Sequence, residues 1–365
     1  MRGAAVRPVV LAAGGTGGHL FPAEALAAEL LARGVRVALL TDKRSGAGTS
    51  DVFRHCEVYV LRGAGLAGRG ARAVGAAAAI AAGTLQARQR LRALRPSVLC
   101  AFGGYPGVAP VLAARMAGVP VVLHEQNAVL GRANRALARW ARMLALSFPG
   151  TKGADGFPSV VTGNPVRPAI LALHGRPYVP PGDDGPIRLL VLGGSLGARV
   201  FSDVVPDAVA ELAPRVRSRV EVVQQCRAED LDRVREAHRA HGTRAELATF
   251  FPDVAERVAT AHLVLARAGA STVAELAVAG RPALFVPLPG SIDDHQAANA
   301  AGLVSIPQRS LTPVRLAGAL SCLGNDVELQ SMAHTSAREG RPAATASLAD
   351  LVMQQAERVP QENAT

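Results

Sequence analysis

A histidine follows a run of glycines near the start of the chain, in the stretch LAAGGTGGHLFPAEALAAELL at residues 11–31. The glycines stand between an apolar run and an amphipathic run, where a strand that turns into a helix can leave backbone N–H groups open to a phosphate. The positive end of a helix dipole disfavours a charged imidazole, so a histidine there tends to be neutral and able to accept a proton. His19 is therefore predicted to act as a general base beside a substrate hydroxyl, with a structural capping histidine as the alternative.

Two common phosphate-binding motifs do not fit these glycines. A dinucleotide fingerprint G-x-G-x-x-G that starts at Gly15 would need its third glycine where Leu20 stands, and a P-loop needs a lysine that is absent here. Asp42, at the end of the next apolar run, could hold a ribose and keeps a nicotinamide-dependent enzyme as an alternative. His19 argues against that alternative, because an imidazole at the start of the helix would crowd a pyrophosphate.

Two later stretches repeat the order of strand, small residues and helix. In GGSLGA, the hydroxyl or backbone N–H of Ser195 could bind a phosphate. In LARAGASTVAELAVAGRPALFVPLP, Ser271 and Thr272 open a helix that carries Glu275 on its first turns. A carboxylate in this place can accept hydrogen bonds from both hydroxyls of a ribose, and an exposed helix position is the alternative reading. The stretch DDHQAANA offers three more polar side chains to the same site: Asp294, Gln296 and Asn299.

Polar residues also follow apolar runs at two places in the middle of the chain. VVLHEQNAVLGRANR passes from a strand pattern directly into four polar residues at 124–127. GNPVR sets Asn164 and Arg167 at a proline-punctuated junction, where the arginine could pair with a diphosphate or a base carbonyl. AFGGYPG adds a glycine turn, Gly103–Gly104, at another strand end.

No metal ion and no cofactor are expected. The four cysteines are scattered without a C-x-x-C pair, which fits buried thiols in a reducing compartment. Asp230 and Asp232 are interpreted as surface residues of a charged helix, and His238 and His241 could share a helix face but lack a second pair of ligands. Charge on a phosphate must then be neutralised by helix N-termini and arginine.

The elements that position these residues follow from the hydrophobic pattern. Short apolar runs alternate with longer helical patterns, which is typical of a parallel α/β sheet. Helices are expected at Ala23–Ala32 and Ala343–Arg358. Strands are expected at Val9–Ala13, Val35–Thr41, Val58–Leu61, Val98–Phe102, Val121–His124 and Met143–Ser147, and then at Ile187–Leu192, Val220–Val223, Leu263–Ala266 and Ala283–Val286.

The 365 residues are enough for two domains of ordinary size. Prolines near Gly163 favour a boundary there, with an N-terminal domain at 1–163, a C-terminal domain at 164–341 and a final helix and tail at 342–365. The short sequence similarity between VLAAGGTGG and LLVLGGSLGA suggests that the two domains are similar.

The net charge of +11 is distributed unevenly along the chain. Residues 1–165 hold 20 Lys and Arg against 7 Asp and Glu, whereas residues 166–365 hold 20 against 22. The first half is therefore expected to meet an anionic partner, which could be a membrane surface, a polyphosphate substrate or nucleic acid, and arginine-rich composition without a partner is the alternative. No run approaches the ~20 apolar residues of a spanning helix, so a soluble chain, at most membrane-associated, is expected.

Taken together and in order, these motifs resemble the MurG family of peptidoglycan N-acetylglucosaminyltransferases. The motifs that carry the resemblance cover nearly the whole chain: GGTGGHLFPA, GGYPG, HEQNAVLGRANR, GNPVR, GGSLGAR, RAGASTVAELAVAGRPALFVPLP and DDHQAANA. The resemblance implies a B-type glycosyltransferase fold, in which two Rossmann-like domains face each other across a cleft and the last helix crosses back to the N-terminal domain. It implies transfer of GlcNAc from UDP-GlcNAc to undecaprenyl-diphospho-MurNAc-pentapeptide (lipid I), which gives lipid II, by a peripheral protein on the cytoplasmic face of the cell membrane.

The resemblance also implies roles for individual residues. His19 is the candidate base for an inverting attack by the acceptor's 4-hydroxyl on the anomeric carbon, which gives a β-(1→4) link as UDP leaves. Glu275 would hold the ribose, Ser195 and the helix start at 270–272 the diphosphate, and Phe250 with Phe251 the uracil. The donor- or substrate-binding residues are expected to be Thr16, Gly17, Gly18, Asn127, Arg167, Ser195, Phe250, Phe251, Ala270, Ser271, Thr272, Val273, Ala274, Glu275 and Gln296.

A basic, apolar stretch in the first half corresponds to the place where the family docks on the membrane. Residues 74–85 are mostly small and apolar, and such a patch gives weak, salt-sensitive attachment to anionic lipid. Almost no aromatic residues lie there, unlike in many relatives. Trp140 is a second candidate contact, with a core position as the alternative. No nucleic-acid partner is expected. The arginines that flank the stretch are Arg69, Arg72, Arg88, Arg90, Arg92 and Arg95.

One motif departs from the family pattern. After the strand VEVV, the family usually has a His-Gln-Ser/Thr-Gly turn, and here the chain reads Gln224-Gln225-Cys226-Arg227. A bulky Arg227 near the nucleotide could alter how the donor is held. This departure keeps open a divergent paralogue that glycosylates a secondary-metabolite acceptor, and an inactive membrane-bound adaptor is a further alternative.

Overall fold

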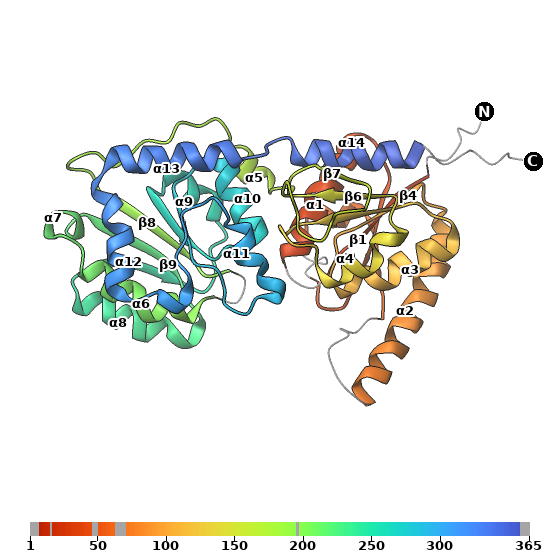
Figure 1. Ribbon diagram of the computed structural model, residues 1–365, viewed down its shortest axis with the longest axis horizontal. Coiled ribbons are helices and arrows are strands. Elements are labelled where there is room, and N and C mark those ends of the chain that lie inside the picture. The colour runs from red at the N-terminus through yellow and green to blue at the C-terminus, as the bar shows by residue number, and fades with distance from the viewer. Residues whose placement is uncertain (1–6, 15–16, 46–49, 63–70, 195–196, 358–365) are drawn as a thin grey trace, which may run out of the picture. The chain divides into compact units, whose positions relative to one another are not determined.

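The computed structural model describes residues 7–14, 17–45, 50–62, 71–194 and 197–357 (Figure 1). Contacts divide the chain into two compact units. Within the described residues, the first unit runs to Arg167 and takes in the chain again from Ala343, and the second is Pro168–Pro342. Each unit has its own parallel sheet, with helices against it.

The first unit contains a seven-stranded sheet in the order β3-β2-β1-β4-β5-β6-β7, and every pairing is parallel. Its strands are β1 (Val9–Ala12), β2 (Val37–Thr41), β3 (Glu57–Val60), β4 (Val98–Ala101), β5 (Val121–Glu125), β6 (Met143–Leu146) and β7 (Ser159–Val161). Its α-helices are α1 (Gly17–Ala32), α2 (Ala71–Leu94), α3 (Val108–Ala117), α4 (Arg132–Leu137) and α14 (Ala344–Glu357), and its 3-10 turns are η2 (Phe53–His55), η3 (Tyr105–Gly107) and η4 (Ala138–Trp140).

Side chains of the central strands of this sheet are buried on both faces. Along β1, Val9 and Leu11 belong to one apolar cluster, and Val10 and Ala12 belong to another. Successive side chains of a strand point to opposite faces, so the two clusters lie on the two sides of the sheet. A strand buried on both faces reads as a continuous apolar run, which explains why β1 was easy to predict.

The last helix, α14, completes one of these clusters. Leu348, Ala349 and Val352 are buried in the same apolar cluster as side chains of α1 and β4, two elements that α14 contacts, although more than 240 residues separate them in sequence. Arg33, next to the end of α1, forms an ion pair with Asp350 at 2.5 Å between Nη1 and Oδ1. The first unit is therefore built from two separate parts of the chain.

The second unit contains a five-stranded parallel sheet in the order β10-β9-β8-β11-β12. Its strands are β8 (Ile187–Leu192), β9 (Val220–Gln225), β10 (Arg244–Ala248), β11 (Leu263–Ala266) and β12 (Ala283–Phe285). Its α-helices are α5 (Pro168–Leu171), α6 (Arg199–Ala210), α7 (Pro214–Arg217), α8 (Leu231–Ala240), α9 (Val254–Thr260), α10 (Ala270–Ala279), α11 (His295–Asn299), α12 (Pro313–Leu320) and α13 (Asp326–Glu339), and its 3-10 turns are η5 (Ala228–Asp230), η6 (Ile292–Asp294), η7 (Gln308–Ser310) and η8 (Ser321–Gly324).

The ten predicted strands are present, and each boundary falls within two residues of its predicted place. The prediction missed β7 and β10, each of which is one of the two edge strands of its sheet. Both are largely exposed and lack the apolar run of a buried strand. The predicted start of the first helix, Ala23, was wrong, because α1 begins at Gly17 and contains Pro22. Pro22 therefore lies inside the helix, although proline is usually confined to the first turn.

The strand order reverses at corresponding places in the two sheets. In the first unit, β1 lies between β2 and β4, and in the second unit, β8 lies between β9 and β11. Ligands of open parallel sheets bind at such switch points, beyond the carboxyl ends of the strands. The glycine turns after β1, β4 and β8 and the small residues after β11 occupy those positions.

We expect the discontinuous part of the first unit to be essential to its stability. Leu348→Ala should lower the free energy of unfolding of this unit by about 2–5 kcal/mol, since it removes a fully buried leucine and leaves a cavity. The single tryptophan of the chain, Trp140, lies in the first unit, so its fluorescence in a urea titration reports this unit. Leu85→Ala, at a leucine that is 63% exposed on α2, is the matched control and should change little. Equal effects of the two substitutions would contradict this account.

Candidate active site

His19 lies in the first turn of α1, at the switch point of the first sheet. Its Nδ1 is 2.8 Å from the backbone oxygen of Phe102, the residue that follows β4, and 3.1 Å from Oε1 of Gln126, which follows β5. Three segments that are far apart in sequence thus meet at one ring. Nδ1 is occupied by these contacts, and Nε2 is the nitrogen left to face a substrate.

The glycine turn after β4 keeps the space beside Nε2 open. Gly104 has a φ of +65°, and a Cβ added to it would stand 3.3 Å from Nε2 of His19. Gly103, with a φ of +77°, lies against Asn134 in the same way. Positive φ angles and close neighbours both favour glycine here, so the turn brings backbone near the histidine without filling the site.

Glu125 organises the polar segment that follows β5. It is buried, and its carboxylate accepts four hydrogen bonds. Oε1 accepts from the backbone and side-chain nitrogens of Asn127 at 3.0 and 3.2 Å, and Oε2 accepts from Gly131 N and Asn134 Nδ2, both at 2.9 Å. A buried carboxylate is stable only when its oxygens are paired in this way. Glu125 therefore fixes the backbone that carries Gln126 and Asn127.

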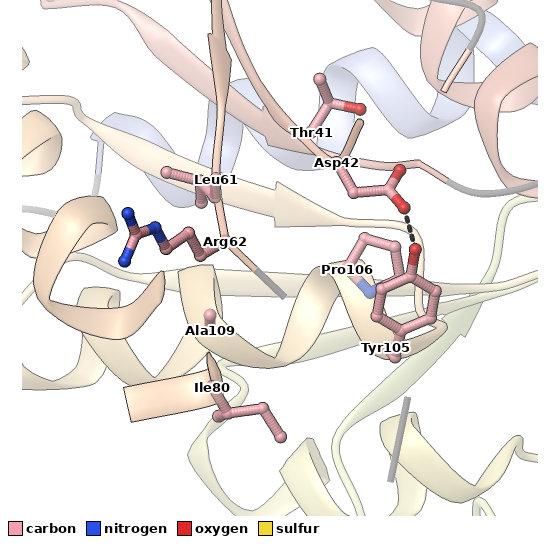
Figure 2. Close-up of a pocket in the computed structure, with 8 residues that line it drawn as sticks. All are labelled: Thr41, Asp42, Leu61, Arg62, Ile80, Tyr105, Pro106 and Ala109. Carbon is pink, nitrogen blue, oxygen red and sulfur yellow. Dashed lines mark hydrogen bonds between the residues drawn. The ribbon is translucent and has the colours of Figure 1, made fainter. Parts of the chain in front are cut away.

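A small pocket lies beside the glycine turns, between β2, α2 and η3 (Figure 2). Figure 2 shows the Tyr105 hydroxyl directed at the carboxylate of Asp42, to which it donates a hydrogen bond. Arg44 completes this group: its Nε is 3.1 Å from the Tyr105 hydroxyl and 3.6 Å from Oδ2 of Asp42. Asp42, for which a nicotinamide-dependent enzyme was considered as an alternative, thus pairs with groups of its own unit. The pocket is lined by Thr41, Asp42, Leu61, Arg62, Ile80, Tyr105, Pro106 and Ala109.

Arg167 lies near the start of α1. Its guanidinium carbon is 5.4 Å from the ring centroid of Phe21, and that ring covers Gly17, where an added Cβ would stand 2.7 Å from the phenyl carbon Cε2. A cation over an aromatic face is a favourable arrangement. Arg167, Gly17, Gly18 and His19 are therefore brought together in the first unit.

In the second unit, the turn after β8 is compact. Gly194 and Gly197 have φ angles of +83° and +69°, and Gly193 donates its N–H to Oε1 of Gln225 at 3.2 Å. Arg227 packs against Gly197, whose added Cβ would stand 2.8 Å from Cγ of the arginine. Ser195 falls within this turn but lies outside the described residues, as does Thr16 in the first unit.

The guanidinium of Arg227 is paired with acidic residues of its own segment. Its Nε is 2.7 Å from Oδ2 of Asp230, and its Nη1 is 3.0 Å from Oε1 of Glu229. Hydrogen bonds from Arg227 and then Arg233 lower the pKa of Asp230 to about 2. Arg227 thus stands at the glycine turn with its charge neutralised locally. The reading of Asp230 as a surface residue was wrong, because it is buried in these ion pairs.

The helix α10 begins with small residues and an uncapped N-terminus. Gly269 is its N-cap and makes no side-chain capping bond, and the first turn has no acidic residue. The hydroxyl oxygen of Ser271 is buried, with no hydrogen-bond partner in the part of the chain that the structure describes. Thr272, Ala274 and Glu275 are half-buried on the same helix. The N–H groups and hydroxyls of this turn are suited to an anion.

Two amides of α11 hold the loops around this helix start. Asn299 donates from Nδ2 to the backbone oxygen of Ala268 at 3.1 Å, directly before α10. Gln296 accepts a hydrogen bond from Leu288 N at 2.9 Å through Oε1, which ties α11 to the loop after β12. The predicted site residues Gln296, Ala270, Ser271, Thr272, Val273, Ala274 and Glu275 thus belong to one region of the second unit.

The two phenylalanines differ in their surroundings. Phe250 is 70% exposed, whereas Phe251 is buried with the guanidinium carbon of Arg257 4.2 Å from its ring centroid. Arg257 is itself paired with Glu246 and Asp253. Phe250 therefore offers an open ring to a ligand, and Phe251 supports the loop from inside.

Among the described residues, no group of three or more His, Cys, Asp or Glu side chains is placed to hold a metal ion. His238 is buried and contacts Oε1 of Gln224 at 3.3 Å, while His241 contacts Asp207 at 2.9 Å. The two histidines thus have separate partners.

Sequence reasoning assigned no role to three residues that shape the site in the first unit: Tyr105, Glu125 and Asn134. Tyr105 directly follows the glycine turn that was singled out, so the same rule about strand ends could have found it. Glu125 and Asn134 act by hydrogen bonds within a loop, and no spacing in the sequence indicates these bonds.

The two units, each with a parallel sheet and a glycine turn at its switch point, define a B-type glycosyltransferase fold. Residues 9–145 match the glycosyltransferase family 28 N-terminal domain, and residues 188–348 match the glycosyltransferase family 28 C-terminal domain. A crystal structure of Acinetobacter baumannii MurG superposes with a TM-score of 0.77 at 30% identity, and the match covers 95% of this chain and 99% of that one.

Within this class, the chain belongs to the MurG family. It is 57% identical over 364 residues to the UDP-N-acetylglucosamine--N-acetylmuramyl-(pentapeptide) pyrophosphoryl-undecaprenol N-acetylglucosamine transferase of Granulibacter bethesdensis, across 97% of this chain and 95% of the relative. It is 50% identical over 356 residues to the protein of the same name from Rhodospirillum centenum, across 95% and 94%.

We expect Gly104→Ala to reduce turnover more than tenfold, because its methyl group would press on Nε2 of His19. Gly104 has a φ of +65° and a ψ of 177°, a region that is essentially restricted to glycine, so alanine adds backbone strain of about 1–3 kcal/mol. Gly118→Ala is the matched control, since Gly118 has a φ of +70° in the same unit and open space around it. Both variants should lose stability in thermal unfolding, Gly104→Ala more than Gly118→Ala because Gly118 has the left-handed helical conformation, and only Gly104→Ala should lose activity in a transfer assay. Equal activity of the two variants would refute the role of this turn.

Proposed function

We propose that this chain transfers GlcNAc from UDP-GlcNAc to lipid I and thereby forms lipid II for peptidoglycan synthesis. The observation that carries this proposal is the 57% identity, over nearly the full length of both chains, to a transferase whose name states this donor and acceptor. The enzyme is an N-acetylglucosaminyltransferase with UDP-GlcNAc and lipid I as its substrates. The second unit binds the donor, and the first unit binds the acceptor.

The start of α10 supports the placement of the donor. Its uncapped N–H groups and the unpartnered hydroxyl of Ser271 suit the diphosphate, with Thr272 beside them. Glu275, half-buried one turn further along, is assigned to the ribose. Gln296 and the exposed ring of Phe250 are assigned to the sugar and the uracil. Arg167, Asn127 and Ser195 complete the donor set.

His19 is assigned as the general base. The oxygen of the acceptor's 4-hydroxyl forms a bond to the anomeric carbon while the bond from that carbon to UDP breaks. UDP leaves with the bonding electron pair, and the hydroxyl proton passes to Nε2 of His19. Attack from the face opposite the leaving group inverts the anomeric carbon and gives a β link. Helix N-termini and Arg167 stabilise the charge that develops on the leaving diphosphate.

The local pairing of Arg227 supports this function over a change of donor. Its guanidinium is bound by Asp230 and Glu229, so it adds little free charge at the glycine turn. Gln225, which keeps the family's glutamine within this turn, accepts from Gly193 N and donates to Thr249 O. The hydrogen bonds that hold the turn are thus present despite the departure, which argues against a change of donor.

The surface of α2 supports peripheral attachment to the cytoplasmic face of the cell membrane. Within the described residues, no helix is long and apolar enough to cross a membrane. Val74 and Leu85 of α2 are 71% and 63% exposed, and Arg90, Arg92 and Arg95 are exposed at its C-terminal end. In Figure 1, the N-terminal part of α2 projects away from the sheet of its unit. Arg69 lies outside the described residues, and nothing is described of the Arg72 side chain.

Two substitutions should separate donor binding from chemistry. Glu275→Ala should weaken UDP-GlcNAc binding about tenfold to a hundredfold, because it removes charge-assisted hydrogen bonds to the ribose. His19→Ala should leave donor binding unchanged and abolish most turnover. Binding is measured by calorimetry, and turnover by transfer of labelled GlcNAc to a short-chain lipid I analogue.

Glu256→Ala and His55→Ala, at exposed residues of the second and first units, are the controls for these two variants and should behave like the parent protein. Unchanged donor affinity in Glu275→Ala would refute the ribose assignment. Near-normal turnover in His19→Ala would remove it as the base. UDP release by the parent protein without transfer to the analogue would indicate another acceptor and refute the lipid II assignment.

Membrane attachment is tested with the double variant Val74→Asp, Leu85→Asp. It should bind vesicles of phosphatidylglycerol and phosphatidylcholine about tenfold more weakly than the parent in cosedimentation, because charges replace the apolar contacts. The double variant Val314→Asp, Val327→Asp removes equally exposed valines from the second unit and should bind normally. Parent binding should weaken as salt is added. Equal binding by both double variants would exclude α2 as the docking surface.

A further inference from the structure

A chain of hydrogen bonds leads from His19 into the interior of the first unit. It passes through Gln126 and His124 to the backbone oxygen of Gly163. Gln126 is 2% exposed and His124 is fully buried. Both side chains lie on the segment that Glu125 holds in place.

The proton positions on His124 follow from its partners. Nε2 lies 3.2 Å from the oxygen of Gly163, and a carbonyl oxygen can only accept. Nε2 therefore carries a proton and donates. Burial lowers the pKa of His124 to about 4, so at neutral pH the ring has one proton only. Nδ1 is then an acceptor, and it faces Nε2 of Gln126 at 3.0 Å.

The orientation of the Gln126 amide follows in turn. Its nitrogen is 3.0 Å from the oxygen of Phe102, which accepts, as well as 3.0 Å from the accepting Nδ1 of His124. Both contacts require the NH2 group on this side, so Oε1 must face His19. Oε1 and the oxygen of Phe102 both lie within 3.1 Å of Nδ1 of His19. Two acceptors at one ring nitrogen require that this nitrogen carries the proton.

We propose that Gln126 and His124 are positioning residues that hold His19 in the tautomer with its proton on Nδ1 and its lone pair on Nε2. This inference rests on the proposed role of His19 as the base, and it specifies which nitrogen acts. Each link of the chain has one allowed direction, because it ends on the fixed backbone oxygens of Gly163 and Phe102. The wrong tautomer would place a proton where the acceptor's proton must go.

The same contacts also assist after proton transfer. When Nε2 has accepted a proton, the ring is positive and Nδ1–H donates to two neutral carbonyl oxygens. These dipoles stabilise the charge without the full opposite charge that a carboxylate would supply. The nearby carboxylate of Glu125 is already bound by four donors of its own loop. The histidine is thus oriented by groups that do not hold it permanently in the charged form.

The test uses Gln126→Leu in the full chain. We expect the catalytic rate constant to fall about tenfold to a hundredfold while KM for UDP-GlcNAc stays the same, as for partners that orient a reacting group. The specific readout is nitrogen NMR of protein labelled in its histidines, with the His19 signals assigned from their loss in His19→Ala. The fraction of His19 with its proton on Nε2 should rise in Gln126→Leu.

Gln355→Leu is the matched control for this substitution. Gln355 is also a fully buried glutamine of the first unit, and neither polar atom of its side chain has a hydrogen-bond partner among the described residues. This variant should keep the parent's rate and the parent's His19 spectrum. If Gln126→Leu fails to fold, His124→Phe replaces it, since phenylalanine keeps the ring shape and Gly163 O still accepts from the Thr162 hydroxyl at 3.1 Å.

An unchanged His19 tautomer in the substituted protein would overturn the inference, and so would a changed tautomer with an unchanged rate. Failure of the proposed function looks different. In that case His19→Ala retains turnover, or the parent gives no transfer, while the NMR comparison still reports the tautomer. A shifted tautomer together with a lower rate constant and a constant KM supports the positioning role.

Discussion

The parallel pairing of β1 with β4 is the constraint on which the site of the first unit depends. It places the end of β1, where α1 begins with its glycines, next to the end of β4, whose following residue presents the Phe102 carbonyl. That one oxygen accepts from both His19 and Gln126, so a backbone atom fixed by the sheet determines the position of two side chains. Pairing of β4 with β5 then brings His124 and Gln126 to the same edge. The chemistry of the histidine is therefore a consequence of strand order.

The second unit uses the same strand order with different chemistry at its edge. Its switch point presents a glycine turn and the uncapped start of α10, which suit an anion, and no histidine follows the glycines of that turn. The first unit presents His19, the proposed base, and an open glycine turn. In the function proposed above, the two units divide the tasks of holding a charged leaving group and accepting a proton. Side chains at the strand ends, and not the sheets, distinguish them.

The sequence allowed prediction of those features that depend on burial or on local spacing. Strands such as β1 and β8 are buried on both faces and read as apolar runs, whereas β10 is an exposed edge strand whose residues, Arg-Ala-Glu-Leu-Ala, resemble a helix. His19 and Glu275 were predicted as site residues because each follows small residues at a strand end. The chain of hydrogen bonds from His19 through Gln126 and His124 could not be predicted, since it ends on backbone oxygens contributed by distant segments. Asp230 was missed for another reason: it pairs with Arg227 and Arg233, which stand three residues away on either side, but a carboxylate in a charge-rich helical run reads as exposed.

The place of α14 has a consequence for how the protein is made. The first 167 residues leave the ribosome well before the helix that packs against α1 and β4 has been synthesised. Domains generally fold as they emerge, but here the N-terminal unit must wait for the entire second unit to be translated before its core is complete. During that interval the nascent chain exposes an apolar surface, which is the kind of intermediate that chaperones bind. A truncation that removes only the last turns of the protein would therefore damage the unit that is made first.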